Sequence, residues 1–571
     1  MKLRWLFFLI CVILGVTLLA GGLLVPAHLR ALDAAVLQGA GRDGFTLLAR
    51  GQSLADGKKL GAAQFVLQAA RIGKIPDSEK FAATWTNLAA QNPDAQFWGD
   101  DSHVKHLFGS HFTAPDQTAP LTDFMVRQEN RDAALAYLGG SRNGAAQALM
   151  RSRSFSKTVI FPPSRSAAGQ AFDMAVSICG LMLDDGRLTG NLNDEILNLA
   201  SQANQGNSSE PLERVLMDFT SLGGRFNWDQ LTAFVAQIQT VKTLHQLAEE
   251  ARGAGEQLPV LFAAVQLSGQ PAGVADYLAT FKETGWQDLG TSLGYGAGGV
   301  RELVQRQQRL YISNWERRVT AFDPFGRFVS SAAKLSVQTP WLALAAKFVS
   351  YMLAGFFLAA ALHFARPEAP TLERPLQVRG FHLFRELLFS VGFLLVVLLL
   401  SEPFLAQEHQ KGDFSLRLFP SMVGGAVPAG IAGIQQTIMN PIILLTLLVF
   451  FVLQFLIYIS CLVKLAEIRR QNIPPGMKLK LLENEDHLFD AGLYLGFFGT
   501  IVSLIVASLG LVKFSLMAAY SSTSFGIIFV VIFKIFHLRP ARRKLLLEAE
   551  AQNPPGERYA PAAEPATVMP S

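Results

Sequence analysis

Cysteine and charge are both scarce in this chain of 571 residues. The three cysteines are Cys11, Cys179 and Cys461, and the first and last fall within long apolar runs, so a disulfide framework and a cysteine-rich metal site are both excluded. Cys179 is alone in a more polar segment, and we expect it to be a small buried core residue. Charged residues make up only 17% of the chain, and the basic ones mostly flank apolar runs, which argues against a nucleic-acid partner.

Catalytic signatures are missing from the more polar segment, residues 26–340. It contains no G-x-S-x-G, no H-E-x-x-H and no P-loop, so we expect neither an enzyme nor a bound cofactor. Its densest polar cluster comprises Asp100, Asp101, His103, His106 and His111. His103 and His106 are three residues apart and could share a helix face as a metal-binding pair. This pair is the only sequence feature that would support an enzymatic function. A polar loop with solvated histidines is the simpler interpretation, and we expect no metal.

Apolar residues, in contrast, are abundant and make up 50% of the chain. A helix needs about 20 consecutive apolar residues to cross the hydrocarbon core of a membrane. Stretches of this kind lie at 5–25, 341–365, about 387–405, 441–465, about 491–512 and 515–536. We therefore expect about six spans. The first is either an uncleaved anchor or a cleaved signal peptide, and its length favours the anchor.

Basic residues predict the orientation of these spans, because cytoplasmic loops are enriched in lysine and arginine. The four basic clusters are Lys2 and Arg4; Arg366, Arg374, Arg379 and Arg385; Lys464, Arg469, Arg470, Lys478 and Lys480; and Arg539, Arg542, Arg543 and Lys544. All four fall on one side if every span crosses. We therefore expect a multi-pass protein of the inner (plasma) membrane with both termini in the cytoplasm, and with residues 26–340 and 406–440 exported to the periplasm or cell exterior.

The exported segment has the pattern of an all-α domain, with apolar residues at spacings of three and four. Asn227 opens an expected helix that runs through Ala251, and Gly253 is placed to end it. The other expected helices are 57–72, 77–91, 121–138, 166–184, 190–204 and 271–284. Residues 297–338 are expected to be a helical stalk leading to span two.

The expected fold class is therefore all-α, a polytopic helical membrane protein with a large exported helical domain between spans one and two. Its expected parts are an N-terminal anchor or signal peptide (1–25), the exported domain (26–340), two spans (341–405), an exported loop (406–440), a three-span unit (441–547) and a disordered cytoplasmic tail (548–571). Charged residues near the ends of spans are expected to be snorkelling anchors: Lys347, Glu402, Lys464, Lys513 and Lys534.

Small and hydroxyl-bearing residues gather in the last two spans. Span five contains Gly496-Phe497-Phe498-Gly499-Thr500, and span six contains Ser521-Ser522-Thr523-Ser524-Phe525-Gly526. Hydroxyl groups within lipid must face protein or water, and small residues let helices approach closely. The two spans therefore either pack together, with Gly496, Gly499 and Gly526 at the contact, or line a shared polar path.

These motifs resemble those of the MotA/TolQ/ExbB proton-channel family. Residues 494–501, Tyr-Leu-Gly-Phe-Phe-Gly-Thr-Ile, resemble that family's second span, which carries a Gly-Leu-Phe-Gly-Thr type motif. Residues 523–526, Thr-Ser-Phe-Gly, resemble its last span, which carries a Thr-Ala-Ile-Gly type motif. The resemblance covers residues 441–547, so that spans four, five and six would be the family's three spans.

The resemblance implies an oligomeric ring of such subunits around a partner with a single membrane span, whose intramembrane aspartate takes up and releases protons. Thr500 and Thr523 would face that carboxylate. The other hydroxyl residues that would line the ion path or face the partner are Ser503, Ser521 and Ser522.

The chain departs from the family's pattern in three respects. The connection between spans four and five, 465–489, is short; Ala518 stands where some members carry a glutamate; and no acid lies mid-membrane in spans four to six, since Asp490 is at the edge.

Two functions from different classes remain open. The first is a proton-channel-like membrane subunit that couples proton-motive force to the exported domain, with the lipid bilayer, further copies of itself and a single-span acidic protein as partners. The second is a non-conducting, membrane-anchored scaffold whose helical domain binds an envelope or periplasmic partner. The lack of an acid in spans four to six favours the second.

Overall fold

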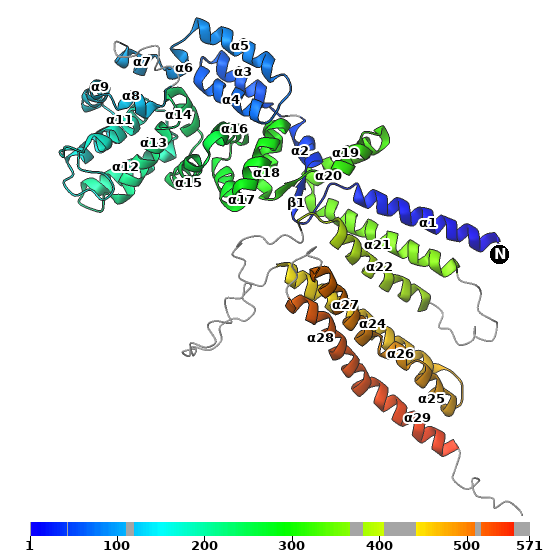
Figure 1. Cartoon of the computed structure of the whole chain (residues 1–571). Helices are drawn as coiled ribbons and strands as arrows, with labels where there is room; N and C mark the ends of the chain where they lie inside the picture. Colours follow the sequence, from blue (N-terminus) through cyan, green and yellow to red (C-terminus); the bar gives the residue numbers. More distant parts are fainter. Residues whose placement is uncertain are drawn as a thin grey trace, which may run out of the picture. The chain divides into compact units, whose positions relative to one another are not determined.

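The computed structural model describes residues 2–42, 44–109, 119–365, 381–404, 441–508 and 516–552, and these residues are almost entirely helical (Figure 1). The chain divides into two compact units. The first, which we call the helical domain, is Pro26–Ala343; the second, which we call the membrane unit, combines Met1–Val25 with the described part of Leu344–Ser571.

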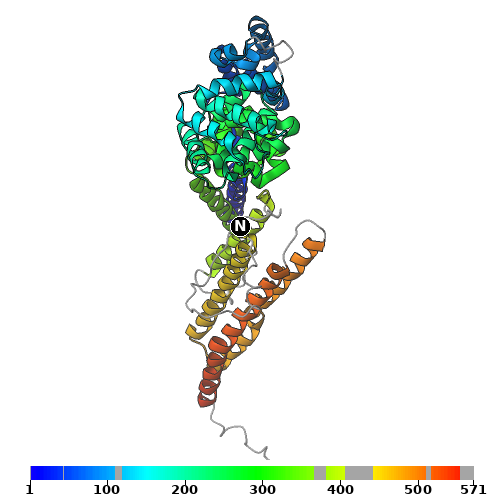
Figure 2. The ribbon, with the colours of Figure 1, turned by 90° about the vertical axis from the view of Figure 1, so that its left-hand side faces the viewer.

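The helical domain consists of short helices in layers, drawn from blue to green in Figures 1 and 2. Its helices are α2 (Ala34–Gly41), α3 (Leu47–Asp56), α4 (Leu60–Ile72), α5 (Ser78–Gln91), α6 (Ala95–Trp98), α7 (Ser102–Phe108), α8 (Leu121–Met125), α9 (Gln128–Gly139), α10 (Gly144–Arg151), α11 (Gln170–Asp184), α12 (Gly190–Asn204), α13 (Glu210–Gly223), α14 (Trp228–Val235), α15 (Val241–Gly253), α16 (Leu258–Ser268), α17 (Pro271–Ser292), α18 (Gly296–Arg306), α19 (Asn314–Thr320) and α20 (Asp323–Gln338). Helices pack on the next but one along the chain, as in α11 on α13, α13 on α15 and α15 on α17. This arrangement is that of a stacked helical solenoid.

One continuous hydrophobic core runs through the domain. Near α6 and α7 it is aromatic: the Trp98 ring stacks on Phe108 with centroids 5.6 Å apart and meets the edge of Phe124 at 5.4 Å. Cys179 is fully buried in this core, as expected of an unpaired small residue.

The expected helix from Asn227 to Ala251 is wrong in its length. Asn227 does cap a helix, through a reciprocal capping box with Gln230, but α14 ends at Val235 and α15 begins at Val241. Ile238 lies in the turn between them and is fully buried, and the Thr189 hydroxyl donates to its carbonyl oxygen over 2.6 Å. The apolar spacing therefore continues through a turn that tertiary contacts stabilise.

The stalk expected at 297–338 is also broken. Gln307 adopts a left-handed conformation (φ 50°) that ends α18, and β2 (Arg309–Tyr311) follows. This strand pairs in parallel with β1 (Ala31–Asp33), with Leu32 opposite Leu310. The Asp288 carboxylate holds β2 in place by accepting from the Leu310 backbone N–H at 3.1 Å. A short strand pair therefore interrupts the otherwise helical chain.

The membrane unit is built of longer, apolar helices. They are α1 (Lys2–Leu23), α21 (Pro340–Ala365), α22 (Phe381–Ser401), α24 (Pro441–Arg470), α25 (Pro475–Asn484), α26 (Asp486–Phe489), α27 (Ala491–Ser508), α28 (Leu516–Ile532), a π-helical segment (Phe533–Leu538) and α29 (Arg539–Gln552). Four stretches of the described residues are long and apolar enough to span a membrane: Arg4–Leu23, Pro340–Ala365, Phe450–Arg470 and Tyr520–Ala551. Two shorter apolar stretches lie in α22 and α27. The described part of the chain is thus almost entirely helical, with four candidate membrane-spanning helices.

Glycines bring α1 and α21 together. An added Cβ at Gly15 would lie 2.8 Å from Leu358, and one at Gly22 would lie 2.7 Å from the Tyr351 ring. Since higher numbers on α1 meet lower numbers on α21, the two helices are antiparallel. Small residues at helix contacts are the usual means by which membrane helices approach closely.

Two of the expected anchors form a buried ion pair instead. The side chains of Lys347 on α21 and of Glu402, just after α22, are each 1% exposed, and Lys347 Nζ lies 3.4 Å from Glu402 Oε1. A snorkelling lysine would extend to water, so this interpretation was wrong for both residues. Lys464 is also paired, with Glu467 at 3.2 Å, whereas Lys513 lies outside the described residues.

Candidate functional site

The helices α27 and α28 form an antiparallel hairpin in which the two expected threonines meet. Thr500 Oγ1 lies 2.5 Å from Thr523 Oγ1, and each of these oxygens lies 3.1 Å from the carbonyl oxygen of Gly496. Thr500 is 7% exposed, and Thr523 is half-buried. The structure therefore brings these two residues together, as the resemblance implies.

The hydrogen bonds of the two threonine hydroxyls can be arranged in two directions. Each hydroxyl has one hydrogen to donate and two lone pairs to accept with. Two hydrogens therefore serve three short contacts, those between Thr500, Thr523 and the Gly496 carbonyl. Either hydroxyl can be the donor to the other, so reversing the direction of this small chain needs rotation of the hydroxyls only.

The three expected packing glycines all lie where α27 and α28 touch. An added Cβ at Gly496 would be 2.8 Å from the Ser522 carbonyl oxygen, and one at Gly499 would be 2.7 Å from the Ser522 hydroxyl. At Gly526 it would be 2.6 Å from the Gly492 carbonyl oxygen. Contacts below 3 Å leave no room for a methyl group, so these glycines let the two backbones approach.

The three serines are placed differently. Ser521 and Ser522 are buried in α28 next to Thr523, and Ser522 faces Gly499 across the hairpin. The side chain of Ser503 lies outside the described residues. Two of the three therefore belong to the buried polar part of the hairpin.

Gln454 on α24 is a further buried polar residue that sequence reasoning missed. It is 1% exposed, and its Nε2 donates to the Gly492 carbonyl oxygen over 3.0 Å. Its Oε1 is buried and has no hydrogen-bond partner among the described residues. The signal was present, because Gln454 is the sole amide side chain in the apolar run 441–465, and a polar side chain in such a run usually faces protein.

One end of this bundle carries an ion pair. Asp490, just before α27, lies 2.7 Å from Lys534 Nζ in the π-helical segment, so Lys534 is paired rather than a free anchor. Nearby, the Tyr458 hydroxyl and His537 Nε2 are 2.9 Å apart. Polar groups thus recur along the bundle from Asp490 through Gln454 to the two threonines.

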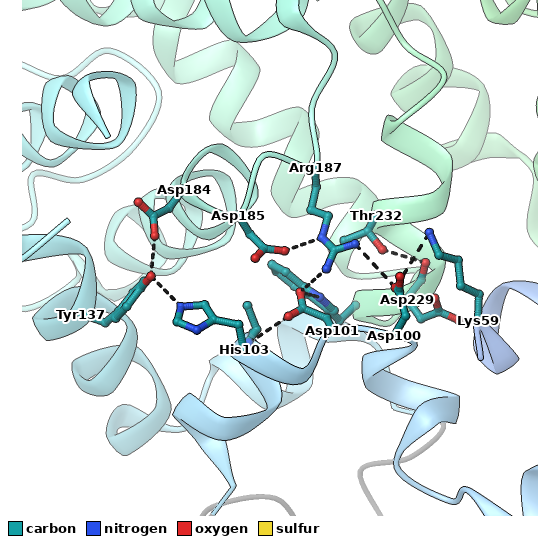
Figure 3. A network of polar contacts seen from close by, with 12 residues as sticks. Lys59, Asp100, Asp101, His103, Tyr137, Asp184, Asp185, Arg187, Asp229 and Thr232 are labelled. Carbon is teal, nitrogen blue, oxygen red and sulfur yellow. Dashed lines mark hydrogen bonds and ion pairs between the residues drawn. The ribbon is translucent and has the colours of Figure 1, made fainter. Parts of the chain in front are cut away.

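The helical domain has its own polar network, centred on Arg187 (Figure 3). The guanidinium lies 3.1 Å from Asp101 and 3.5 Å from Asp100, and it also contacts Asp185. Asp101 accepts a further hydrogen bond from the Trp228 indole N–H over 2.9 Å. Burial raises the pKa of the Asp185 carboxyl, and its hydrogen bond with Asp101 adds to that effect. The acids of the predicted polar cluster are therefore held by a cation of the same chain.

The candidate metal pair, His103 and His106, does not form a metal site among the described residues. Both side chains are exposed on α7, and His103 Nε2 lies 2.7 Å from the Tyr137 hydroxyl, which donates to Asp184 over 2.6 Å (Figure 3). This bond to Asp184 raises the pKa of Tyr137 to about 12. No group of three His, Cys, Asp or Glu side chains in the described ranges could hold a metal ion, and His111 lies outside them.

Asp229, beside this network, is fully buried at the start of α14. Its carboxylate accepts from the Ala62 backbone N–H over 2.9 Å. Burial raises the pKa of Asp229 to about 7, although the hydrogen bond from Ala62 and the charge of Lys59 oppose the shift. Asp229 therefore ties α4 to α14 and makes their packing sensitive to pH.

The described residues therefore form an almost entirely helical protein, with four helical stretches long and apolar enough to span a membrane and a large helical domain between the first two of them in sequence. Comparison with family models, with curated proteins and with solved structures gives no match.

Proposed function

We propose that this chain is a membrane subunit of the MotA/TolQ/ExbB kind, which takes part in proton movement and couples it to the helical domain. One observation carries the proposal: Thr500 and Thr523, which the resemblance puts opposite a proton-carrying acid, lie 2.5 Å apart on neighbouring apolar helices. A pair of hydroxyls that can exchange donor and acceptor roles suits a site where a carboxylate alternately binds and loses a proton.

The titrating acid would come from another chain. No Asp or Glu lies in α27, in α28 or in the apolar run 441–465 of α24, so these segments supply no carboxylate that could bind and release a proton. A carboxylate at membrane depth is costly unless hydroxyls, amides or water surround it. We propose a single-span partner with an intramembrane aspartate, seated against a ring of copies of this chain.

The same proposal includes an orientation. With about six spans, α22 and α27 would cross the membrane along with the four longer apolar stretches. The four basic clusters would then lie in the cytoplasm with both termini, and the helical domain would lie on the opposite side of an inner membrane. Proton movement in the bundle would thus be felt by an exported domain.

Proton flux into liposomes tests the proposal directly. The chain would be reconstituted with the products of its neighbouring genes, and a potential would be imposed with potassium and valinomycin. We expect Thr500→Val and Thr523→Val to abolish the flux, because each keeps the side-chain volume and removes the hydroxyl. Thr500→Ser should retain it. Ser524→Ala is the matched control, since this exposed hydroxyl donates only to the Tyr520 carbonyl of its own helix.

A second candidate is the non-conducting scaffold, and one observation favours it. The hydroxyls of Thr500 and Thr523 bond to each other and to Gly496, and glycines close the hairpin around them, which is also a complete account of tight helix packing. Absence of flux in every combination, together with a defined complex between the helical domain and a co-purified envelope protein, would favour the scaffold and refute the channel. Flux that survives in both valine variants would refute the role of the threonines.

A further inference from the structure

The last two helices of the helical domain, α19 and α20, carry exposed aromatic side chains. The helices α19 and α20 precede α21, and α20 ends at Gln338, two residues before Pro340. Thr339 between them has φ −140° and ψ 79°, so the helix is interrupted there and the chain changes direction. The helix α20 is therefore a separate element joined directly to the start of α21.

Only part of the apolar stripe of α20 is covered by protein. In its C-terminal half, Val329, Ala333 and Ser336 are buried, and Ala333 packs against Gly39 of α2. These residues are three and four apart and mark one face of the helix. Towards the N-terminus the same stripe continues with Phe322 and Phe325, whose side chains are exposed.

We call the exposed aromatic side chains of α19, of the turn after it and of the first half of α20 the aromatic elbow. It consists of Trp315, Phe322, Phe325 and Phe328. Phe322 is 63% exposed and the other three are 43–45% exposed. The rings of Phe322 and Phe325 pack on each other with centroids 5.7 Å apart. Contiguous exposed aromatics of this kind mark an interaction surface.

The described charges around the aromatic elbow are mostly positive. Arg318, Arg327 and Lys334 are exposed, and Asp323, the one acid of residues 315–338 whose side chain is described, is paired with Arg327. The polar face of α20 and its aromatic stripe lie on different sides of the helix. An amphipathic helix with aromatics on one face and cations on the other is typical of segments that lie in the bilayer interface.

The aromatic elbow is close in sequence to two apolar helices that are candidates to span the membrane. Phe328 is 12 residues from Pro340, about 18 Å at the rise of an α-helix. On the other side, α2, which covers the rest of the stripe, begins 11 residues after α1 ends at Leu23. Both connections lead into apolar spanning helices. At the start of α21, Trp341 is 71% exposed, so the lipid-facing surface of the chain begins close to the elbow in sequence.

We propose that the aromatic elbow docks on the lipid bilayer, with its phenyl and indole rings at the boundary of headgroups and acyl chains and its cations toward lipid phosphates. Tryptophan is enriched at that level of a membrane because its ring is amphipathic, and phenylalanine is common on the apolar face of helices that lie in the interface. The helical domain would then be held to the membrane surface by this contact in addition to its two chain connections. This inference does not depend on proton conduction.

A fluorescent label at Phe325 tests the docking in the full chain. The native cysteines are all buried, so an introduced Phe325→Cys can be labelled selectively with an environment-sensitive NBD fluorophore. The purified chain is placed in nanodiscs of phosphatidylcholine and phosphatidylglycerol, with or without a nitroxide on the upper acyl chain. We expect the nitroxide lipid to quench about half of the NBD emission, as for a group seated in the interface.

Two matched labels keep the test falsifiable. Ser331→Cys lies on the polar face of α20 and should be quenched less than Phe325→Cys, whereas Val159→Cys, in a loop of the helical domain and 64% exposed, should be quenched by aqueous iodide only. The proposal is overturned if the label at 325 behaves as the label at 159 does. It is equally overturned if the label at 325 is shielded from both quenchers, which would mean that a second copy of the chain covers the elbow.

Discussion

Glu213 gives a prediction in which one carboxylate controls one loop. It is fully buried on α13, where it accepts from the backbone N–H groups of Val159, Ile160 and Phe161 over 2.6–3.1 Å and from the Ser209 hydroxyl over 2.6 Å. Glu213→Gln keeps the shape of the side chain but removes the charge and replaces one acceptor oxygen by a donor. The loop around Val159 should therefore open more often.

The size of the effect follows from the number of bonds lost. Gln can still accept from Ile160 and Phe161 through one oxygen, but its NH₂ group would face the Val159 N–H, so at least one charge-assisted bond is lost. Such a bond contributes about 1.5–3 kcal/mol, and each 1.36 kcal/mol is a factor of ten in an equilibrium constant. Opening of the loop should become about 10- to 150-fold more frequent.

Hydrogen–deuterium exchange of the full chain, resolved to the amides of residues 159–161, measures this opening. Glu210→Gln is the matched control, because Glu210 is on the same helix but its ion pair with Arg214 is exposed. Glu210→Gln should leave exchange at 159–161 unchanged. Exchange in Glu213→Gln within threefold of the unaltered chain would refute the reasoning.

The same carboxylate predicts a pH dependence. Burial alone would raise the pKa of Glu213, but the hydrogen bonds from Ser209 and from the loop outweigh it and lower the pKa below its ordinary value. A lowered pKa contributes stability that is present above the ordinary value and is lost as pH falls through the folded-state value. Protection of residues 159–161 should therefore fall in acid in the unaltered chain and stay flat in Glu213→Gln.

Three further outcomes are expected. Because burial raises the pKa of Asp229 to about 7, the contribution of this residue to stability is full below pH 4 and is lost as pH rises to 7. Asp229→Asn should remove this part of the pH dependence of stability, measured by denaturation of the helical domain at different pH values and followed by tryptophan fluorescence. Gly526→Ala should destabilise the bundle by about 1–3 kcal/mol, whereas Gly392→Ala, with open space around its Cβ, should not, as thermal unfolding in detergent would show. Lys347→Met should cost about 3–5 kcal/mol in the same assay and adding Glu402→Gln should recover most of it, since a lone buried charge is the main cost.

The α27–α28 hairpin is the part that the sequence predicts best. Long apolar runs are predicted to be helices because few other structures can bury them. Once two such helices are antiparallel, the glycines and threonines of 496–526 are expected at the contact between them. Their contacts, from Gly496 to Ser522 and from Thr500 to Thr523, are those expected from the motifs. What such motifs do in function is a separate question, which the flux experiment addresses.

Local apolar periodicity does not predict where a helix ends when contacts with residues distant in sequence determine that end. The apolar spacing from Leu231 to Leu247 continues through the turn at Ile238, so this spacing does not distinguish two helices from one, whereas contacts from α12 and its N-cap Thr189 do. One such contact is the Glu195 carboxylate, which accepts from the Val241 N–H over 2.6 Å at the start of α15. Thr240, the N-cap of α15, was the available local signal.

The ion pair between Lys347 and Glu402 could not be predicted from the sequence for the same reason. Lys347 and Glu402 are 55 positions apart, and each taken alone resembles a residue at the edge of a span. Only the packing of α21 on α22 reveals that both are buried. The single amide of α24, Gln454, was overlooked because the apolar residues around it dominated the pattern.

The strand pair β1–β2 has a mechanical consequence. The strands are parallel, and the connection to α1 leaves from the N-terminal end of β1 while the connection towards α21 leaves from the C-terminal end of β2. Tension that draws these two connections apart would pull the strands lengthwise past each other, so their hydrogen bonds would resist together instead of parting one after another. The strand pair would therefore keep the first and last segments of the helical domain together when the helices α1 and α21 pull on them.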